Sequence, residues 1–363
     1  MSTVFLTGFP GFLGSELLPR VLARSADASA VCLIQTKFAD LARGRLAELT
    51  AAHPEIDGRV RLVEGDITRP DLGLPAEGAD LKGVTAEIYH LAAVYDLSVP
   101  RAVGMKVNVE GTRYMLDFAA DCPRLRRFHY VSTCYVSGRH PGRFTEDDLI
   151  VGQKFNNYYE ETKYLAEVEV QERMAEGLAA TIYRPAIVVG DSRTGATQKY
   201  DGPYYIIRWI LRQPALAMVP VVGDPKATRV NLVPRDFVIG AIAQLSGLDR
   251  SAGRVYQLTD PAPLTVDELL IEIGRATGRT LLRMPLPLGL AKGALDYAPF
   301  VYRLLQIPAT AVDYFVHPTE YTCEHTRADL AGSGLEAPPI RSYIDRMVAF
   351  AQAHPEIGSA AMA

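Results

Sequence analysis

Three glycines near the start of the chain constrain its fold more than any other feature. An apolar run at residues 3–6 leads into Thr-Gly-Phe-Pro-Gly-Phe-Leu-Gly at residues 7–14, and a helix-like segment follows at residues 15–22. Glycines at this spacing permit a tight turn, let backbone N–H groups approach a pyrophosphate, and let the helix pack against the strand. The helix N-terminus then offers unpaired donors to phosphate groups. The pattern predicts a dinucleotide-binding turn, with an ordinary glycine-rich turn as the alternative; its binding residues are Thr7, Gly8, Gly11, Phe12, Leu13 and Gly14.

The composition is that of a globular protein with room for two domains. Hydrophobic residues make up 48% of the 363 residues and charged residues 22%. The formal net charge of −4 gives no basic field for nucleic acid, so no nucleic-acid partner is expected. The four cysteines have neither metal-ligand spacing nor a disulfide pattern, so we expect free thiols, no metal site and a cytoplasmic protein.

Strand-like and helix-like segments alternate along the first two-thirds of the chain. Strands are predicted at residues 30–35, 60–64, 87–91, 127–132 and 180–183, and helices at residues 38–52, 107–120 and 160–176. This alternation predicts an α/β fold with a doubly wound parallel sheet and a ligand crevice at the strand ends. We expect a nucleotide-binding domain at residues 1–190, with segments returning to the sheet around 229–260. A smaller, mainly substrate-binding domain is expected at residues 191–363, with a surface loop at 191–202.

A tyrosine and a lysine four residues apart provide the second chemical signal. Tyr159 and Lys163 lie within a predicted helix and therefore share one of its faces. A tyrosine hydroxyl has a pKa near ~10, and a nearby ammonium group favours the phenolate and lowers that value. The pair could thus supply a general acid for a carbonyl oxygen, although such a spacing by itself is usually structural.

A strand that ends in hydroxyl side chains lies upstream of this pair. Residues 128–133 are Phe-His-Tyr-Val-Ser-Thr, so the predicted strand carries Ser132 and Thr133 where the sheet presents its ligand edge. Hydroxyl donors at that edge could polarise a substrate carbonyl. A turn that caps the strand is the alternative for this segment alone.

Taken together and in this order, these features resemble the extended short-chain dehydrogenases/reductases. Further matching segments are Gly-Asp-Ile at 65–67, His-Leu-Ala-Ala at 90–93, Asn-Val-Glu-Gly-Thr at 108–112 and Tyr-Arg-Pro-Ala-Ile-Val-Val-Gly at 183–190. The resemblance covers residues 3 to about 240 and implies an NAD(P)-dependent oxidoreductase. It implies that Thr133 is the catalytic hydroxyl, with Ser132 as the alternative, and that Tyr159 and Lys163 also hold the nicotinamide ribose. The other implied cofactor contacts are Asp66 and Ile67 at the adenine, Leu91, Ala92 and Ala93 at the ribose and pyrophosphate, Asn108, and Pro185 and Ile187 near the nicotinamide.

Finer details resemble the fatty acyl-CoA reductase and thioester-reductase branch, the male sterility-like proteins. They include the exact sequence of residues 7–14, Gly-Asp-Ile-Thr at 65–68, Gly-Asp-Ser-x-Thr-Gly at 190–195 and His-Pro-x-x-Tyr at 317–321. The resemblance implies a small-molecule substrate, a fatty acyl thioester or the derived aldehyde, that receives hydride at its carbonyl carbon. The alternatives are a hydroxysteroid or ketone–alcohol dehydrogenase of the same superfamily and a non-catalytic nucleotide-binding sensor.

The end of the predicted second strand bears on the choice of nicotinamide. An acid at this position would favour NAD, and residues 35–37 are Gln-Thr-Lys. Gln35 lies at the strand tip, and Lys37 and Arg45 could meet a 2′-phosphate. We therefore expect NADP(H) rather than NAD(H), with solvated surface charge as the alternative for both cations.

Apolar segments of the C-terminal half could form a tunnel for a long acyl chain. They comprise residues 204–210, 286–290 and 300–305. Core packing is the alternative for each residue, and a peripheral membrane contact is a further interpretation of residues 286–307.

Overall fold

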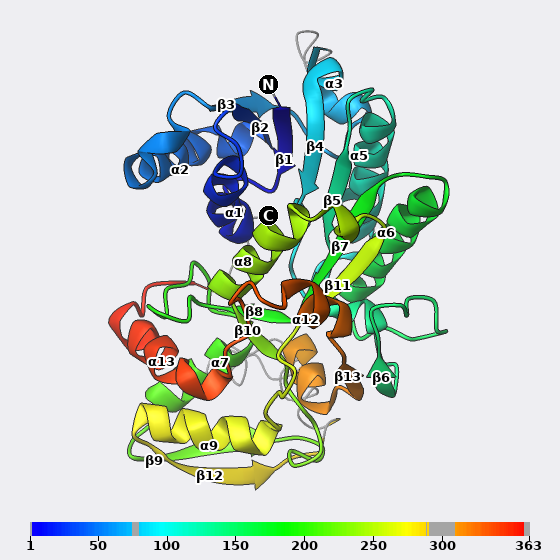
Figure 1. The fold of residues 1–363 in the computed structure, drawn as a ribbon. Coiled ribbons are helices and arrows are strands. Elements are labelled where there is room, and N and C mark those ends of the chain that lie inside the picture. Colours follow the sequence, from blue (N-terminus) through cyan, green and yellow to red (C-terminus); the bar gives the residue numbers. More distant parts are fainter. Residues whose placement is uncertain (1, 75–79, 288, 290–308, 359–363) are drawn as a thin grey trace.

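Seven strands form one sheet in the computed structural model, which describes residues 2–74, 80–287, 289 and 309–358. The strands are β1 (Ser2–Thr7), β2 (Ala28–Ile34), β3 (Val60–Glu64), β4 (Thr85–His90), β5 (Arg127–Val131), β7 (Ala180–Pro185) and β11 (Arg254–Leu258). Their order is β3–β2–β1–β4–β5–β7–β11, and every neighbouring pair is parallel (Figure 1). The chain order turns back at β1, which creates the crevice that doubly wound sheets use for ligands. The predicted fold class is confirmed.

Helices cover both faces of this sheet because its central strands are apolar on both sides. Along β1, Val4 and Leu6 face one helical layer and Phe5 faces the other, as the two-residue repeat of a strand requires. The first layer contains α1 (Phe12–Leu22), α2 (Ala39–Ala52) and α8 (Arg235–Ser246). The second contains α3 (Asp80–Val84), α5 (Gly111–Ala120) and α6 (Tyr158–Ala175).

A smaller unit lies below the sheet in the view of Figure 1. Its helices are α7 (Pro203–Leu211), α9 (Val266–Thr277) and α13 (Ile344–Ala353), and they share one hydrophobic cluster. Its strands form two parallel pairs: β8 (Ile187–Val189) with β10 (Leu232–Pro234), and β9 (Leu216–Val221) with β12 (Thr280–Pro285). A capping box between Thr265 and Glu268 starts α9.

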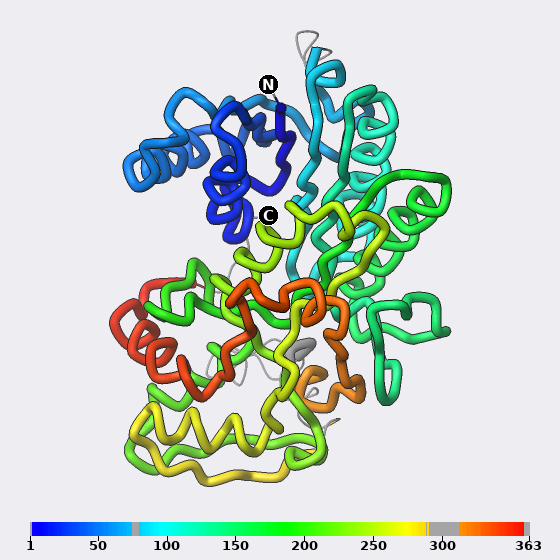
Figure 2. The backbone as a smooth tube through the Cα atoms, in the orientation of Figure 1, coloured from blue at the N-terminus to red at the C-terminus, as the bar shows by residue number. Residues whose placement is uncertain are grey.

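The chain returns to the large sheet after this unit begins. The strand β11 lies at the sheet edge, and α8 lies beside α1, where Arg24 donates a hydrogen bond of 3.0 Å to the Ser246 hydroxyl. Figure 2 shows the yellow-green tube of α8 close to the blue tube of α1. Of the segments expected to return around residues 229–260, β11 and α8 do so, whereas β10 pairs with β8.

The remaining elements are short and mostly connect the main ones. They are η1 (Thr36–Phe38), η2 (Pro54–Ile56), η3 (Pro70–Gly73), α4 (Arg101–Gly104), η5 (Met105–Glu110), η6 (Cys134–Ser137), β6 (Gly142–Phe144), η7 (Asp249–Ser251), η8 (Ala309–Val316), β13 (Thr319–Tyr321), α12 (Glu324–Leu330) and η9 (Ile340–Ser342). The helix predicted at residues 107–120 begins earlier, at Arg101, and includes a π-helical turn at η5. Much of the apolar stretch 286–307 lies outside the described residues. Within the described ranges, no helix combines the length and apolar character needed to cross a bilayer.

Candidate active site

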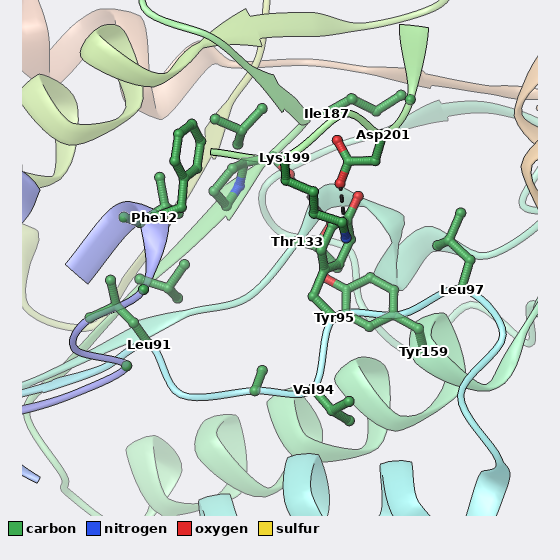
Figure 3. Close-up of a pocket in the computed structure, with 18 of the residues that line it drawn as sticks. Phe12, Leu91, Val94, Tyr95, Leu97, Thr133, Tyr159, Ile187, Lys199 and Asp201 are labelled. Carbon is green, nitrogen blue, oxygen red and sulfur yellow. Dashed lines mark hydrogen bonds and ion pairs between the residues drawn. The ribbon is translucent and has the colours of Figure 1, made fainter. Parts of the chain in front are cut away.

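A cavity of about 600 Å³ lies along the carboxyl ends of the sheet strands. Residues at the ends of β1, β2, β4, β5 and β7 line it, and it extends to α7, α9 and η8 of the smaller unit. Parallel α/β sheets bind ligands at this edge. The cavity is therefore the candidate active site (Figure 3).

The glycine turn forms one end of the cavity. Gly8 has φ +88°, and a Cβ there would come within 2.9 Å of Leu91. A Cβ on Gly14 would lie 2.6 Å from the carbonyl oxygen of Gly8. Gly11 caps α1 without a side chain, and the first turn has no acidic residue, so no side chain of this turn competes with an anionic ligand for its N–H groups. The turn therefore fits a pyrophosphate.

A buried histidine supports this turn from below. His90 contacts the hydroxyl of Thr7 at 2.8 Å through Nδ1 and the hydroxyl of Thr112 at 3.1 Å through Nε2. Burial and the charge of Lys163 lower the pKa of His90 to about 3, so it remains neutral. Its two hydrogen bonds connect β4 to β1 and α5, so its role is structural rather than that of a proton donor.

Thr133, Tyr159 and Lys163 all line the cavity, because the end of β5 and the start of α6 lie side by side there. Thr133 follows β5, and its hydroxyl donates a bond of 3.4 Å to the carbonyl of Pro185 and hydrogen-bonds to Tyr159. Tyr159 and Lys163 lie in the first turns of α6, which Asn157 caps through a 3.0 Å bond from the Glu160 N–H. The geometry places a hydroxyl, a phenol and an ammonium group at one wall.

The structure corrects the expected action of Lys163 on Tyr159. Lys163 Nζ donates to the Tyr130 hydroxyl at 2.9 Å and to the Val131 carbonyl at 2.8 Å, and burial lowers its own pKa to about 7. Burial raises the pKa of Tyr159, although the hydrogen bond with Thr133 opposes this shift. The two groups share a helix face, but the described hydrogen bonds of the lysine go to β5 rather than to Tyr159. Tyr159 is consequently a protonated phenol, ready to donate.

A fully buried ion pair holds the elements that carry these residues, and we call Arg184–Glu167 the core pair. Arg184 donates to one oxygen of Glu167 through Nη2 at 2.7 Å and Nε at 2.9 Å, and both side chains are 0% exposed. The Ser132 hydroxyl donates to the other carboxylate oxygen. The core pair thus joins β7, α6 and the end of β5, next to Lys163 and Thr133. Ser132 is directed into this network.

Most of the other residues predicted to bind the cofactor also line the cavity. They are Thr7, Gly8, Gly11, Phe12, Leu13, Gly14, Gln35, Lys37, Ile67, Leu91, Ala92, Ala93, Pro185 and Ile187. Lys37 Nζ lies 4.9 Å from the ring centre of Phe38, which lines the same end. No acidic residue occurs among the described lining residues at the tip of β2.

Arg45, Asp66 and Asn108 are not among the described lining residues. Arg45 pairs with Glu48 at 2.9 Å and with Glu16 at 3.5 Å, so its guanidinium is directed along the helix surface. Burial opposes the ionisation of Asp66, but bonds from Thr68 and Gln35 hold its pKa below the usual value. Asn108 accepts the N–H of Val94 at 2.9 Å and donates to the Thr162 hydroxyl at 3.0 Å.

Asn108 therefore has a supporting position in the structure. The π-helical turn η5 presents its amide to the loop after β4 and to α6. Such turns redirect side chains that a regular helix would point elsewhere. The amide links the cavity-lining Val94 to the residue that precedes Lys163 in the chain.

The smaller unit supplies an apolar wall, which we call the apolar arm. Of the residues predicted at 204–210, Tyr205 and Ile206 line the cavity, whereas Tyr204, Ile207 and Ile210 pack in the hydrophobic cluster. Further members of the arm, which were not predicted from the sequence, come from α9 and its surroundings: Val230, Val266, Leu269, Leu270, Ile273 and Phe315. Their helical spacing indicated an apolar face but not what it covers.

The loop predicted to lie on the surface at residues 191–202 was also interpreted incorrectly. Thr197, Lys199, Asp201 and Gly202 line the cavity, and Tyr200 is completely buried. Tyr95, in the loop after β4, also lines the cavity and contacts this segment, because Lys199 Nζ lies 4.4 Å from the centre of its ring. Its polar, glycine-containing sequence, a few residues after the end of the sheet strand β7, was a signal for a ligand-lining loop that could have been used.

Comparisons with known proteins agree with this geometry. The male sterility protein family, an NAD-binding family, matches residues 6–242. The terminal R domain of the myxalamid PKS-NRPS biosynthetic pathway has a solved structure that superposes with a TM-score of 0.80 at 28% identity, covering 98% of this chain and 91% of that domain.

Two curated relatives are much longer proteins. One chain of the linear gramicidin synthase of Brevibacillus parabrevis is 30% identical over 279 residues, which are 74% of this chain and 5% of that protein. Glycine betaine reductase ATRR of Emericella nidulans is 31% identical over 279 residues, which are 72% of this chain and 21% of that protein. The chain thus corresponds to a small part of each relative.

Proposed function

This chain belongs to the male sterility protein family of extended, NAD(P)-dependent short-chain dehydrogenases/reductases, and we propose that it reduces an acyl thioester or the derived aldehyde. The observation that carries the proposal is the convergence of Thr133, Tyr159 and Lys163 on the cavity that begins at the glycine turn. The similarity to the myxalamid R domain and to a glycine betaine reductase supports a carbonyl substrate.

The side chains divide the chemistry among them. A bound nicotinamide would supply the hydride for the carbonyl carbon. Thr133 would donate a hydrogen bond to the carbonyl oxygen, and Tyr159 would transfer its proton there as negative charge develops. An aldehyde becomes an alcohol in this way, whereas a thioester becomes a hemithioacetal, whose C–S bond then breaks to release the thiol and the aldehyde. Because burial keeps Tyr159 protonated, a proton is available throughout the neutral pH range. The Lys163 ammonium donates to Tyr130 and to the Val131 carbonyl rather than to Tyr159, and near its pKa of about 7 it accepts or releases a proton.

We further propose NADPH as the preferred cofactor. Gln35 and Lys37 lie at the cavity end that suits an adenosine ribose, and Lys37 offers an ammonium group to a 2′-phosphate. Replacing Lys37 by Met should raise the KM for NADPH roughly tenfold, the loss of one charge-assisted contact, while changing the KM for NADH little. Arg45→Met is the matched control, since Glu16 and Glu48 already engage that guanidinium. Equal effects of Lys37→Met on both cofactors would contradict the NADPH proposal.

The apolar arm supports a fatty acyl chain as the part of the substrate beyond the carbonyl. Leu269, Leu270 and Ile273 present one face of α9 to the cavity, and Ile206 and Phe315 add to it. We assign this substrate-binding role to residues 191–363 and the nucleotide-binding role mainly to residues 1–190. A ketone–alcohol dehydrogenase is the second candidate, favoured by the flat aromatic rings of Tyr135, Tyr205 and Tyr314 at the cavity.

Product analysis with a substrate panel tests the proposal. The purified chain with NADPH should convert acyl-CoA thioesters or long aldehydes and leave ketosteroids unchanged. Tyr159→Phe should reduce kcat by roughly 10²–10⁴-fold, because the proton donor is lost, while NADPH binding persists. A panel that shows turnover of ketones alone would favour the second candidate. Unchanged turnover by Tyr159→Phe would refute the role given to this residue.

A further inference from the structure

A second ion pair faces the cavity beside Tyr159, and we call Lys199–Asp201 the pocket pair. Lys199 Nζ lies 3.2 Å from an oxygen of Asp201, and the side chains are 22% and 17% exposed. The same Nζ lies 4.4 Å from the ring centre of Tyr95, and the Tyr95 hydroxyl hydrogen-bonds to Asp201. Figure 3 shows these side chains gathered on one side of the cavity.

The pocket pair is one aromatic ring away from the proposed proton donor. The rings of Tyr95 and Tyr159 meet edge to face with their centres 5.1 Å apart. Tyr95 lines the cavity and retains 38% of its surface exposed. A group bound by the pocket pair would therefore lie within a few carbon atoms of a carbonyl at Tyr159.

A charged pair at this place is chemically unexpected if the substrate is a plain hydrocarbon. Asp201 is the one carboxylate among the described residues that line the cavity, and burial raises its pKa. Desolvating charges beside apolar walls is unfavourable unless further hydrogen bonds compensate. An ammonium group has three donors and a carboxylate about four acceptor positions. The contacts described above leave donor and acceptor capacity directed at the cavity.

We propose that the pocket pair binds a hydroxyl group that the substrate carries close to its reacting carbonyl. This inference rests on the proposed function and names its substrate class: hydroxylated acyl thioesters or aldehydes rather than unsubstituted ones. A hydroxyl accepts a hydrogen bond from Lys199 and donates one to Asp201. Lys199 would repel a substrate ammonium group, and Asp201 would repel a substrate carboxylate. The ion pair, whose net charge is zero, therefore favours an uncharged polar group.

An amide of a thioester's pantetheine arm can donate and accept hydrogen bonds as a hydroxyl does, so it could occupy the pocket pair instead. An aldehyde has no such arm, so aldehyde substrates test the acyl part of the substrate alone. The test compares octanal with 3-hydroxyoctanal in the full chain with NADPH. We expect the wild type to have at least tenfold higher kcat/KM for 3-hydroxyoctanal, since sites built for a hydroxyl discriminate strongly against analogues that lack it.

Lys199→Met and Asp201→Asn should each lower this ratio to less than threefold. Gln198→Met is the matched control, because Gln198 lines the cavity from the same loop, and it should keep the wild-type ratio. Melting temperatures establish that each variant is folded. If either variant does not fold, Lys199→Gln serves in its place as the variant that breaks the pocket pair. A wild-type ratio within twofold of unity, or variants that keep the full ratio, would overturn the inference.

Binding of unreactive alcohols separates this inference from the proposed function. With the oxidised cofactor present, 1,3-octanediol should bind at least tenfold more tightly than 1-octanol, and the advantage should disappear in Asp201→Asn. If no aldehyde is turned over but this advantage is found, the proposed function fails and the hydroxyl site stands. If octanal is reduced well and the diol has no advantage, the hydroxyl site is refuted and the reductase stands.

Discussion

The molecule contains two ion pairs near the same reactive side chains, and they are built differently. In the core pair, Arg184 and Glu167 are fully buried, and Ser132 and the carbonyls of Thr145 and Asp148 use their remaining capacity. In the pocket pair, Lys199 and Asp201 keep about a fifth of their surface open. The comparison indicates that a saturated pair fixes structure, whereas an open pair at a cavity is available to a ligand.

Breaking the core pair should have the largest effect. Arg184→Met leaves the Glu167 carboxylate buried without its cation, which costs about 3–5 kcal/mol of unfolding free energy. Lys199→Met, the matched change in the pocket pair, should cost roughly 1 kcal/mol or less. Urea unfolding of both variants measures the difference. Similar losses in the two variants would mean that the pairs do not differ as described.

Double-mutant cycles should sharpen the same comparison. We expect a coupling energy of roughly 2–3 kcal/mol between Arg184 and Glu167, from Arg184→Met combined with Glu167→Leu. The cycle of Lys199→Met with Asp201→Asn should give less than about 1 kcal/mol. The unfolding free energies of the single and double variants supply both values. A larger coupling in the pocket pair would reverse the assignment of roles.

The buried carboxylate of Glu160 shows what a counter-ion such as Arg184 does for a buried acid, because Glu160 has neutral hydrogen-bond partners. Glu160 is buried, and its described contacts come from neutral groups of Asn156 and Tyr314, so burial raises its pKa to about 7. The folded state then holds a proton that the unfolded state has already released, and stability falls as pH rises from about 4.5 to 7. Glu160→Gln should therefore raise the unfolding free energy by roughly 2–3 kcal/mol more at pH 8 than at pH 5.

Thermal unfolding of wild type and Glu160→Gln across this pH range measures the effect. A gain that is equal at pH 5 and pH 8 would show that the variant acts through packing rather than through the charge of Glu160. The core pair provides the contrast, because Glu167 has Arg184 as its buried counter-ion.

Local sequence was sufficient for much of the fold and of the cofactor end of the cavity. The glycine turn and the alternation of strands and helices predicted the parallel sheet, because both depend on short-range geometry and on two-sided burial. The spacing of Tyr159 and Lys163 likewise predicted a shared helix face. The prediction that Lys163 lowers the pKa of Tyr159 was wrong. The lysine hydrogen-bonds to Tyr130 and Val131, which belong to a strand distant in sequence.

The substrate side was decided by tertiary structure. Tyr95 and Asp201 are separated by more than a hundred residues, and nothing local shows that the two side chains meet at one cavity wall. The same holds for the apolar face of α9, which the sequence shows as amphipathic without indicating whether a core or a cavity covers it. The sequence by itself thus determined the sheet, the turn and the reactive residue types, which follow from local periodicity. Only the packing of the smaller unit onto the sheet decided what surrounds the reacting carbonyl, because those contacts join segments that are distant in the chain.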